Sequence, residues 1–371
     1  MKIAYVITRA DAVGGASVHV REMARAMLDR GHDAVVLVGG RGPVTDQFEA
    51  AGIPFVSLAW MRRTVLPASD VLALRELTDA LRRLRPDLVS AHTAKAGWIG
   101  RAACARLRIP CIYTHHGWPV AGRFTGARGA IFAVAERIAA RWARAIVCVC
   151  RYERDLALAH RIAPAERLRV IHNGVGDLAP ELRADPVSNP VRIVCVARME
   201  RPKDHATLLR ALGSLRSLEW TLDLVGNGPL EPQLRALATS LGIAGRIRFL
   251  GYQPDPAEAL ARAQVFALSS LSEALPRSVL EALRAGLPVV ATGVGGVAEA
   301  VTHGENGLLV PPSDPGALAA ALGEMIGDAS RRRQYGAAAR RAYESSFRLE
   351  RMIEETLAVY HIVIGACQLG K

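Results

Sequence analysis

The sequence lacks the patterns of several common protein classes. None of its 371 residues forms an Asp-x-Asp motif, and no His/Cys cluster has the local spacing of a metal site. Its six cysteines form no Cys-x-x-Cys pair and no disulfide framework, which favours reduced thiols in a cytoplasmic protein. No run approaches the roughly 18 uncharged apolar residues of a membrane span. The N-terminus is not a secretory signal, because Arg9 and Asp11 interrupt its short apolar run. We therefore expect a soluble chain with no bound metal.

Charge is scarce and uneven. Only 22% of the residues are charged and half are hydrophobic, which excludes a disordered chain. Residues 1–180 carry 26 Lys+Arg against 15 Asp+Glu, whereas residues 181–371 are nearly balanced. The excess lies in helices such as 127–144, and such a face is either a solvated basic surface or one that meets an anionic membrane, a nucleic acid or a phosphorylated substrate. No nucleic-acid motif accompanies it, so we expect no nucleic-acid partner.

Short apolar runs alternate with amphipathic helical stretches along the whole chain. Runs that are apolar on both faces and separated by helices predict parallel strands in covered sheets. The Pro-rich segment 176–190 interrupts the pattern once and predicts a linker. The expected fold is α/β, with two Rossmann-like doubly wound domains facing a central cleft. We expect domains at 1–175 and 191–350, and a C-terminal helix at 351–371 that packs back toward the first domain.

Two glutamates, Glu273 and Glu281, stand in the apolar region SEALPRSVLE. Pro276 is suited to the first position of a helix, which places Glu273 in the preceding loop and Glu281 about a turn and a half into the helix. A helix N-terminus binds phosphate through its free amides. Carboxylates beside such a site are suited to accept hydrogen bonds from sugar or ribose hydroxyls.

Arg198 and Lys203 follow another predicted strand, in the stretch VARMERPKD. Two cations aimed at one cleft can neutralise a diphosphate without a metal ion. The sequence therefore places candidate phosphate-binding and sugar-binding residues at the carboxyl ends of two strands.

The motifs together resemble a known family. SEALPRSVLEALRAGLPVVATGVGG is similar to the E-x7-E region of the family 4 glycosyltransferases, retaining enzymes with the GT-B fold. VARMERPKD, LVGNGPL, IHNGV and the N-terminal AVGGASVHV resemble further motifs of that family, in the same order, over residues 1–350. AHTAKAGWIGRAA with YTHHGW resembles the bacterial branch that builds capsular, extracellular and O-antigen polysaccharides.

The resemblance implies roles for individual residues. Glu273 would hold hydroxyls of the donor sugar, and Glu281 the nucleotide ribose, while Arg198 and Lys203 bind the diphosphate. His116 would lie beside the reacting sugar, so the implied catalytic residues are His116, Arg198, Lys203 and Glu273. The implied donor-binding residues are Gly14, Gly15, Asn173, Gly226, Ala274, Leu275, Pro276, Glu281, Gly295 and Gly296. His92, Lys95 and His115 are expected on the acceptor side, and His115 and His116 could exchange roles.

The chain departs from the family pattern at a few positions. Ala274 stands where a glycine is usual, and Ser17 where an acidic residue is common. The stretch Pro202-Lys203-Asp204 also differs in detail. These changes bear on loop geometry and donor preference more than on activity.

The predicted reaction transfers a hexosyl unit from a UDP- or GDP-sugar to a saccharide acceptor, without a cofactor. We expect the acceptor to be linked to a polyprenyl diphosphate, at the cytoplasmic face of a membrane that the protein contacts peripherally. Three alternatives stay open. They are a UDP-sugar 2-epimerase of GT-B fold, a nicotinamide oxidoreductase, which the absence of Gly-x-Gly-x-x-Gly after either first strand disfavours, and a non-catalytic sugar-binding module.

Overall fold

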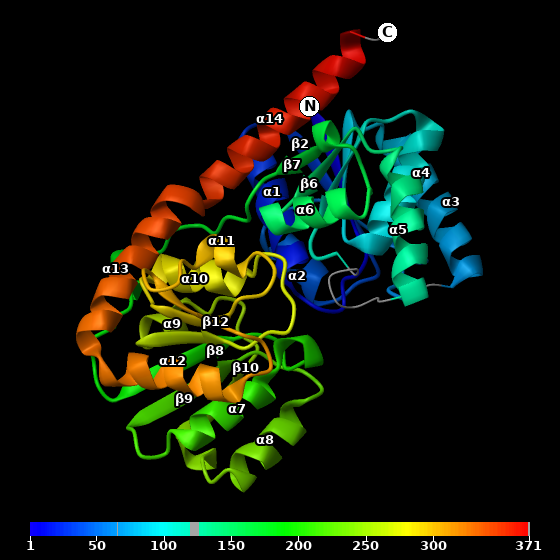
Figure 1. The fold of residues 1–371 in the computed structure, drawn as a ribbon. Helices are drawn as coiled ribbons and strands as arrows, with labels where there is room; N and C mark the ends of the chain where they lie inside the picture. Colours follow the sequence, from blue (N-terminus) through cyan, green and yellow to red (C-terminus); the bar gives the residue numbers. More distant parts are fainter. Residues whose placement is uncertain (65, 119–125, 370–371) are drawn as a thin grey trace. The chain divides into compact units, whose positions relative to one another are not determined.

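The computed structural model describes residues 1–64, 66–118 and 126–369. The chain divides into two compact units. The first holds Met1–His172 together with Met352–Lys371, and the second holds Asn173–Arg351. Each unit contains one parallel β-sheet with helices packed on it (Figure 1). The predicted α/β fold with two Rossmann-like parallel sheets is thereby confirmed.

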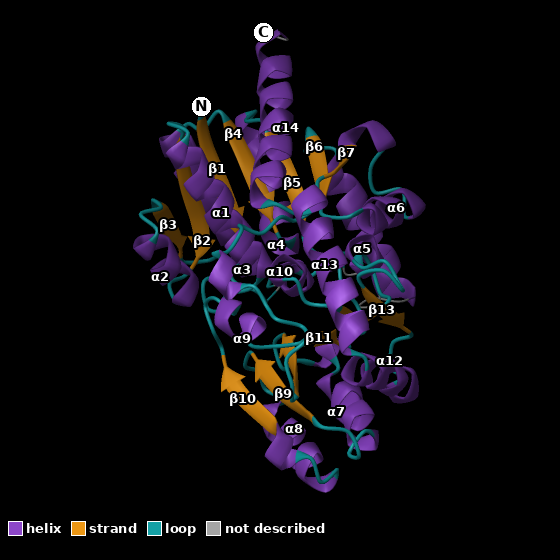
Figure 2. Cartoon of the chain, turned by 90° about the vertical axis from the view of Figure 1, so that its left-hand side faces the viewer, coloured by secondary structure: helices purple, strands orange, loops and turns teal. Residues whose placement is uncertain are grey.

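The sheet of the first unit has seven strands in the order β3-β2-β1-β4-β5-β6-β7, and all their pairings are parallel. Figure 2 shows these strands side by side with helices in front of them and behind them. Every side chain of β4 and β5 is buried, as expected for strands covered on both faces. The strands are β1 Lys2–Ile7, β2 Asp33–Gly39, β3 Phe55–Leu58, β4 Leu88–His92, β5 Cys111–His115, β6 Ala145–Cys148 and β7 Leu168–Val170.

The helices of the first unit join these strands in chain order. They are α1 Gly15–Asp29, α2 Pro43–Ala50, α3 Pro67–Leu84, α4 Ala94–Leu107, α5 Gly126–Ala140 and α6 Arg151–Ala159. The last helix of the chain, α14 (Leu349–Leu369), carries residues 352–369 into this unit. Its Tyr360 hydroxyl donates to the Ser90 Oγ on β4 at 3.0 Å, and both side chains are buried. The C-terminal helix is therefore part of the packing of the first unit.

The sheet of the second unit has six parallel strands in the order β10-β9-β8-β11-β12-β13. The strands are β8 Val191–Val196, β9 Trp220–Val225, β10 Ile247–Gly251, β11 Val265–Leu268, β12 Val289–Thr292 and β13 Gly307–Val310. The helices are α7 His205–Ser214, α8 Glu231–Ser240, α9 Ala257–Ala261, α10 Arg277–Ala285, α11 Val297–Ala300, α12 Pro315–Gly327 and α13 Ala329–Ser346.

Side-chain caps fix where several of these helices begin. The carboxylates of Asp204, Asp314 and Asp328 accept a backbone N–H from the first turns of α7, α12 and α13. Each such cap satisfies one of the amides that a helix leaves unpaired at its start. Gly286 ends α10 with φ +79°, a left-handed conformation that favours glycine.

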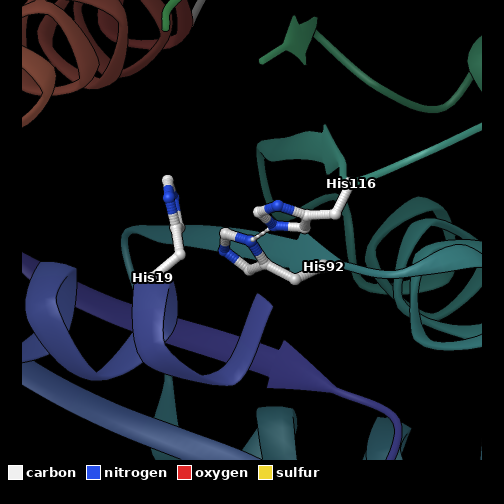
Figure 3. A group of neighbouring side chains, drawn as sticks. All are labelled: His19, His92 and His116. Atoms are coloured by element: carbon white, nitrogen blue, oxygen red, sulfur yellow. Dashed lines mark hydrogen bonds between the residues drawn. The ribbon is translucent and has the colours of Figure 1, made fainter. Parts of the chain in front are cut away.

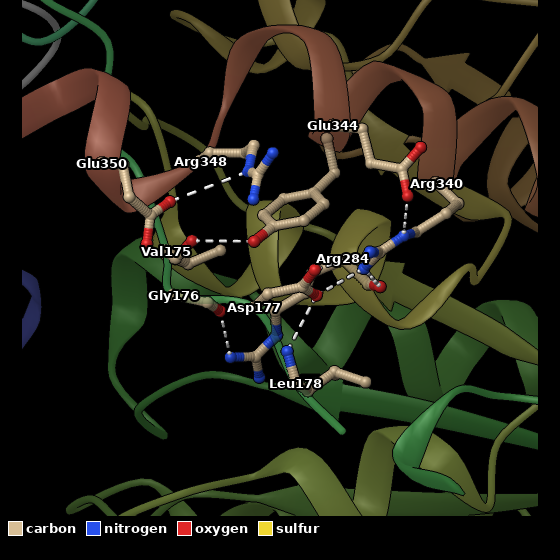
Figure 4. A network of polar contacts seen from close by, with 10 residues as sticks. Val175, Gly176, Asp177, Leu178, Arg284, Arg340, Glu344, Arg348 and Glu350 are labelled. Carbon is tan, nitrogen blue, oxygen red and sulfur yellow. Dashed lines mark hydrogen bonds and ion pairs between the residues drawn. The ribbon is translucent and has the colours of Figure 1, made fainter. Parts of the chain in front are cut away.

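The segment 176–190, which the sequence predicts to be a linker, belongs to the second unit. Figure 4 shows how α10 and α13 hold its first residues. Arg340 donates two hydrogen bonds of 2.7 Å to Asp177, and Arg284 donates to the Gly176 carbonyl at 2.9 Å. The Arg340 guanidinium holds the pKa of Asp177 down to about 2. The buried Arg332 donates to the Pro186 carbonyl further along the segment at 2.6 Å. The prolines interrupt the periodic sequence pattern, but these contacts keep the segment packed on the second unit.

Candidate active site

The sheet of the second unit reverses its strand order between β8 and β11. Arg198 and Lys203 lie in the segment that follows β8, and Glu273 lies in the one that follows β11. In open parallel sheets, ligands bind outside the carboxyl ends of the strands at such a reversal. These three charged side chains therefore stand where a ligand of this sheet is expected.

Lys203 and Glu273 form an ion pair at this point. The Lys203 ammonium donates to Glu273 Oε1, which also accepts the Ser270 hydroxyl at 2.6 Å. The Glu273 side chain is only 9% exposed, and that of Lys203 is 25% exposed. A carboxylate has about four lone-pair positions, so Glu273 can still accept hydrogen bonds from a ligand. The pair places a fixed acceptor and a cation next to each other.

Arg198 is more exposed than Lys203 and forms an ion pair with Glu200 at 2.5 Å. Its loop packs against the turn after β9, where Met199 and Asn227 share a backbone hydrogen bond of 2.9 Å. Gly226 in this turn has φ +136°, and a Cβ there would lie 2.1 Å from the Ala197 carbonyl oxygen. Gly226 was predicted to contact the donor; in the structure, close packing against the Arg198 loop already requires glycine at this position.

Several of the predicted donor-binding residues position the loop that carries Glu273. The buried Asn173 amide donates to the Leu275 carbonyl at 3.0 Å, and the Gly296 N–H donates to the Ala274 carbonyl at 2.6 Å. A Cβ on Gly295, where φ is +58°, would lie 1.8 Å from the Glu273 carbonyl oxygen. These contacts hold the backbone of the loop in place, so Asn173, Gly295 and Gly296 act on the site through it.

Helix α10 begins one residue later than predicted. Pro276 is its N-cap, in an extended conformation, and Arg277 is its first helical residue. Pro276 has no N–H to leave unpaired, and its fixed φ suits the start of a helix. The difference of one residue lies within the usual uncertainty of a helix boundary. Glu281 lies just over one turn into the helix and is half-buried. The first turn of α10 thus begins at the end of the loop that carries Glu273.

The first sheet reverses its strand order between β1 and β4. The loop after β1 contains Gly14, which caps α1 with φ −161°, and Gly15, the first residue of that helix. Both glycines are exposed, and a Cβ on Gly14 would meet no atom within 4 Å. Neither the backbone conformation nor the neighbouring protein atoms require glycine at position 14.

Three histidines lie together at the carboxyl ends of the strands of the first sheet (Figure 3). His92 Nδ1 and His116 Nε2 are 3.1 Å apart in a hydrogen bond, and the His19 ring meets that of His116 edge-on with centroids 4.9 Å apart. His92 was predicted on the acceptor side, but its side chain is completely buried and contacts His116 instead of the surface. His19 was not singled out in the sequence, although it lies within the glycine-loop motif and one turn into α1.

The two adjacent histidines have different environments. His115 is buried, stacks on Trp118 with centroids 3.7 Å apart, and lies 3.3 Å from the Glu153 carboxylate. His116 is half-buried and belongs to the three-histidine cluster. Lys95, also expected on the acceptor side, is buried in an ion pair with Asp70 at 2.5 Å. His115 and Lys95 thus have partners within the protein, and His116 is the more accessible of the two histidines.

The histidine cluster is the group that could hold a metal ion among the described residues. One ring nitrogen from each of His19, His92 and His116 lies within 4.8 Å of the others. No local spacing in the sequence signals this group, because its members come from α1, β4 and the residue after β5.

Acidification is expected to destabilise the second unit through His205. Burial lowers the pKa of this histidine to about 4, and the Lys203 charge adds to the effect, whereas the unfolded chain titrates near 6.5. The stabilisation is complete above about pH 6.5 and is lost as the pH falls toward 4. Between pH 7 and pH 5 the loss is about 2 kcal/mol. Urea unfolding at the two pH values should show it, and His205→Leu should reduce it.

Burial also lowers the pKa of His92, so part of the dependence will remain in His205→Leu. An unchanged pH dependence in His205→Leu would contradict the assignment.

Two family models match most of the chain. The model described as Glycosyltransferase Family 4 matches residues 13–177, and the model described as Glycosyl transferases group 1 matches residues 181–342. The chain belongs to glycosyltransferase family 4. Its two Rossmann-like sheets are the GT-B fold that its structural neighbours have.

Individual relatives of this glycosyltransferase agree with the family. The 2-deoxystreptamine N-acetyl-D-glucosaminyltransferase of Streptomyces fradiae is 28% identical over 97% of this chain and 93% of that enzyme. The lipopolysaccharide core biosynthesis glycosyltransferase LpsE of Rhizobium meliloti is 36% identical over 44% of this chain and 49% of its own. The crystal structure of Anabaena Alr3699/HepE in complex with UDP and glucose has a TM-score of 0.84 at 23% identity. It covers 97% of this chain and 99% of that protein.

Within the described residues of this glycosyltransferase, no helix combines the length and hydropathy needed to cross a membrane.

Proposed function

We propose that this glycosyltransferase transfers a hexosyl unit from a nucleoside diphosphate sugar to a saccharide acceptor with retention of the anomeric configuration. One observation carries the proposal. Lys203, Glu273 and Arg198 stand together at the strand reversal of the second sheet, beside the start of α10. This arrangement offers cations for a diphosphate and a carboxylate for sugar hydroxyls.

The donor is assigned to the second unit group by group. Arg198 and Lys203 neutralise the diphosphate, and the first amides of α10 add N–H donors with the positive end of the helix dipole. Glu273 accepts from hydroxyls of the sugar, and Glu281, one turn further, accepts from the ribose. The ion pair between Lys203 and Glu273 orients both groups before the donor arrives.

The first unit supplies the other groups. Gly14 is exposed and not required by the fold, which supports close approach of a ligand to this backbone. In this proposal His116 lies beside the reacting sugar, and His92, whose Nδ1 is 3.1 Å from His116 Nε2, orients its ring. His92 is then a positioning residue.

The reaction is accelerated mainly by stabilisation of the charge on the leaving diphosphate. The bond between the anomeric carbon and the diphosphate breaks, a bond to the acceptor oxygen forms on the same face, and the acceptor proton passes to the leaving phosphate. Charge develops on the diphosphate in the transition state, where Arg198, Lys203 and the α10 amides stabilise it. No side chain is assigned as a covalent nucleophile, and the two cations supply the positive charge that a metal ion supplies in other enzymes.

The donor is a UDP- or GDP-sugar in this proposal, and the UDP and glucose held by Anabaena HepE favour the uridine nucleotide. A thermal-shift panel of UDP-, GDP-, ADP- and dTDP-sugars tests the assignment. A ligand present at 100 times its dissociation constant stabilises the protein by about 2.7 kcal/mol. Failure of all four to raise the melting temperature would contradict a nucleotide-sugar donor.

The acceptor is a growing saccharide in capsular, extracellular or O-antigen polysaccharide synthesis, carried on a polyprenyl diphosphate at the cytoplasmic membrane face. The similarity to LpsE, a lipopolysaccharide core enzyme, supports this pathway. Nucleotide release is expected to depend on the acceptor, and NMR of the product should give the donor's anomeric configuration. Conversion of the donor into an epimeric nucleotide sugar without any acceptor, and with no net release of nucleotide, would instead favour a sugar epimerase.

The surface of α5 supports a peripheral membrane contact. Ile131, Val134 and Ile138 follow each other at spacings of three and four residues, so they share one helical face, and all are exposed. Trp142, four residues further, is exposed as well. Trp142 lines one of two surface pockets that share Arg141 and Arg167, and the arginines that line the two pockets are Arg108, Arg137, Arg141, Arg144, Arg161 and Arg167. Apolar side chains among arginines suit the surface of an anionic bilayer.

Binding to anionic vesicles is expected to depend on α5. The protein should float with vesicles that contain phosphatidylglycerol at low salt, and less with pure phosphatidylcholine. The double variant Arg137→Glu/Arg141→Glu should lose most of this binding, since each basic residue contributes about 1 kcal/mol. Arg210→Glu/Arg235→Glu, at two exposed arginines on α7 and α8 of the second unit, is the charge-matched control. Equal flotation with both vesicle types would contradict the membrane contact.

A further inference from the structure

The three-histidine cluster of the first unit has the composition of a metal site. His19 comes from α1, His92 ends β4, and His116 directly follows β5. Their ring nitrogens lie within 4.8 Å of one another, and those of His92 and His116 are 3.1 Å apart. Two nitrogens bound to one zinc ion in tetrahedral geometry are separated by about 3.3 Å. The His92–His116 pair is already close to that separation, and His19 needs a small movement to join it.

The three rings differ in orientation and in burial. The rings of His92 and His116 are nearly parallel, with an interplanar angle of 24°, and the ring of His19 stands at 71° to that of His116 (Figure 3). His19 and His92 are buried, whereas His116 is half-buried. An ion among the three would have protein on one side and a more accessible side near His116.

The outer contacts of His92 match those of metal-ligating histidines. Its second nitrogen, Nε2, is 3.0 Å from the Ser90 Oγ, which also accepts the Tyr360 hydroxyl at 3.0 Å. Ser90 and Tyr360 are both buried. A partner on the far nitrogen fixes the tautomer and the direction of the near one, and such partners are usual around protein metal sites. If Ser90 accepts the Nε2 proton, the lone pair of His92 Nδ1 points toward His116.

We propose that His19, His92 and His116 form a binding site for a late first-row divalent metal ion, with Zn²⁺ as the best fit. Three imidazoles suit zinc, copper, nickel and cobalt, and tetrahedral coordination by three histidines with an open fourth position suits Zn²⁺ in particular. The hydrogen bond between His92 and His116 is replaced by two metal–nitrogen bonds. Ser90 and Tyr360 are the outer positioning residues of the site.

This inference goes beyond the proposed transfer reaction, in which no step uses the ion. The site lies in the first unit, whereas the groups assigned to the diphosphate lie in the second. A metal site was not predicted, because the three histidines have no local ligand spacing in the sequence. By linking α1 to β4 and to the end of β5, a bound ion should stabilise the first unit.

The test is a Zn²⁺ titration of the full chain, stripped by chelator and freed of any affinity tag, in competition with a chromophoric chelator. One equivalent per chain is expected to bind, and its addition should raise the melting temperature. Cobalt(II) in place of zinc should give the intense visible bands of a tetrahedral ion. His19→Ala, His92→Ala and His116→Ala should each weaken binding at least as much as the 10- to 100-fold typical of outer-sphere changes.

Matched variants separate the site from adventitious binding and from misfolding. His361→Ala, which removes an exposed histidine, should bind zinc like the wild-type chain. Ser90→Ala and Tyr360→Phe leave all three ligands in place and should weaken binding 10- to 100-fold, so they remain informative if a histidine variant does not fold. Absence of stoichiometric binding, binding retained in all three histidine variants, or loss in His361→Ala would overturn the proposal. Nucleotide-sugar binding, measured separately in metal-free buffer, is expected to persist in folded His19→Ala, which removes a ligand that has no role in the proposed transfer, so failure of either proposal can be recognised alone.

Discussion

Lys203→Ala is expected to lower kcat/KM for glycosyl transfer by about 10²- to 10³-fold, the usual effect of removing one donor that stabilises developing charge. Lys203 is the cation nearest Glu273, to which it donates a hydrogen bond. Its removal takes a positive charge from the diphosphate and an orienting partner from the carboxylate. Steady-state kinetics with the natural donor measure the effect, and kcat should fall because the charge develops in the transition state.

The matched control for this variant is Arg235→Ala. Arg235 is an exposed cation of the same unit that pairs with Glu231 along α8. Its replacement should leave kcat/KM unchanged. If Lys203→Ala retains wild-type kinetics, or loses no more activity than Arg235→Ala, the diphosphate is not bound where we place it. Glu273→Ala should remove transfer as well, and unchanged turnover in that variant would favour a non-catalytic sugar-binding role.

Glu136→Ala is expected to cost about 3–5 kcal/mol of unfolding free energy, because it leaves the charge of Arg101 buried without its partner. Both side chains are completely buried, with Arg101 Nη2 and Glu136 Oε2 2.9 Å apart. Glu136 also accepts the Trp98 indole N–H, and the Arg101 guanidinium lies 4.0 Å from the centre of the Tyr113 ring. The pair joins α5 to α4. Its loss should therefore lower the melting temperature of the first unit by about 10 °C.

An exposed pair on the same unit provides the comparison. Asp79 contacts Arg82 on α3 with both side chains more than half exposed. Asp79→Ala should change stability by less than about 0.5 kcal/mol. Replacing the buried pair together, as Arg101→Met/Glu136→Leu, should recover much of the stability lost in Glu136→Ala. A small effect of Glu136→Ala in urea unfolding would contradict burial of an ion pair at this place.

The alternation of apolar runs and helices was enough to predict the two parallel sheets. Strands such as β1, β4 and β8 are largely buried, so their sequences are mostly apolar and easily recognised. The edge strand β3 was missed. Its four residues FVSL are only partly buried, except for Leu58, and such a short mixed run resembles a loop. Helices α2 and α6 were missed for a similar reason, since each has few buried side chains.

The charged residues of the candidate site could be found in the sequence because each follows a strand. Arg198, Lys203 and Glu273 lie at carboxyl ends of strands, and the fold brings those ends to one edge of the sheet. Their mutual contacts could not be predicted, because the Lys203–Glu273 pair joins residues 70 positions apart.

The contacts within the histidine cluster could not be predicted from the sequence either. His19, His92 and His116 share no local spacing, and only the strand order β1-β4-β5 brings them together. Lys95 and His115 were expected on the acceptor side, and no pattern in the sequence separates an exposed histidine or lysine from one whose partner is distant. Burial of these groups depends on tertiary packing by α3 and α6, which carry their partners.

The central claim is that the strand reversal of the second sheet binds a nucleoside diphosphate through Lys203 and its neighbours. Isothermal titration of the full chain with UDP and with GDP tests it most directly, because it needs neither the sugar nor the acceptor. We predict saturable one-site binding of one of the two nucleotides, at least tenfold weaker in Lys203→Ala and unchanged in Arg235→Ala, where tenfold corresponds to about 1.4 kcal/mol. Equal affinity in Lys203→Ala and the wild-type chain, or no binding of either nucleotide, would contradict the account.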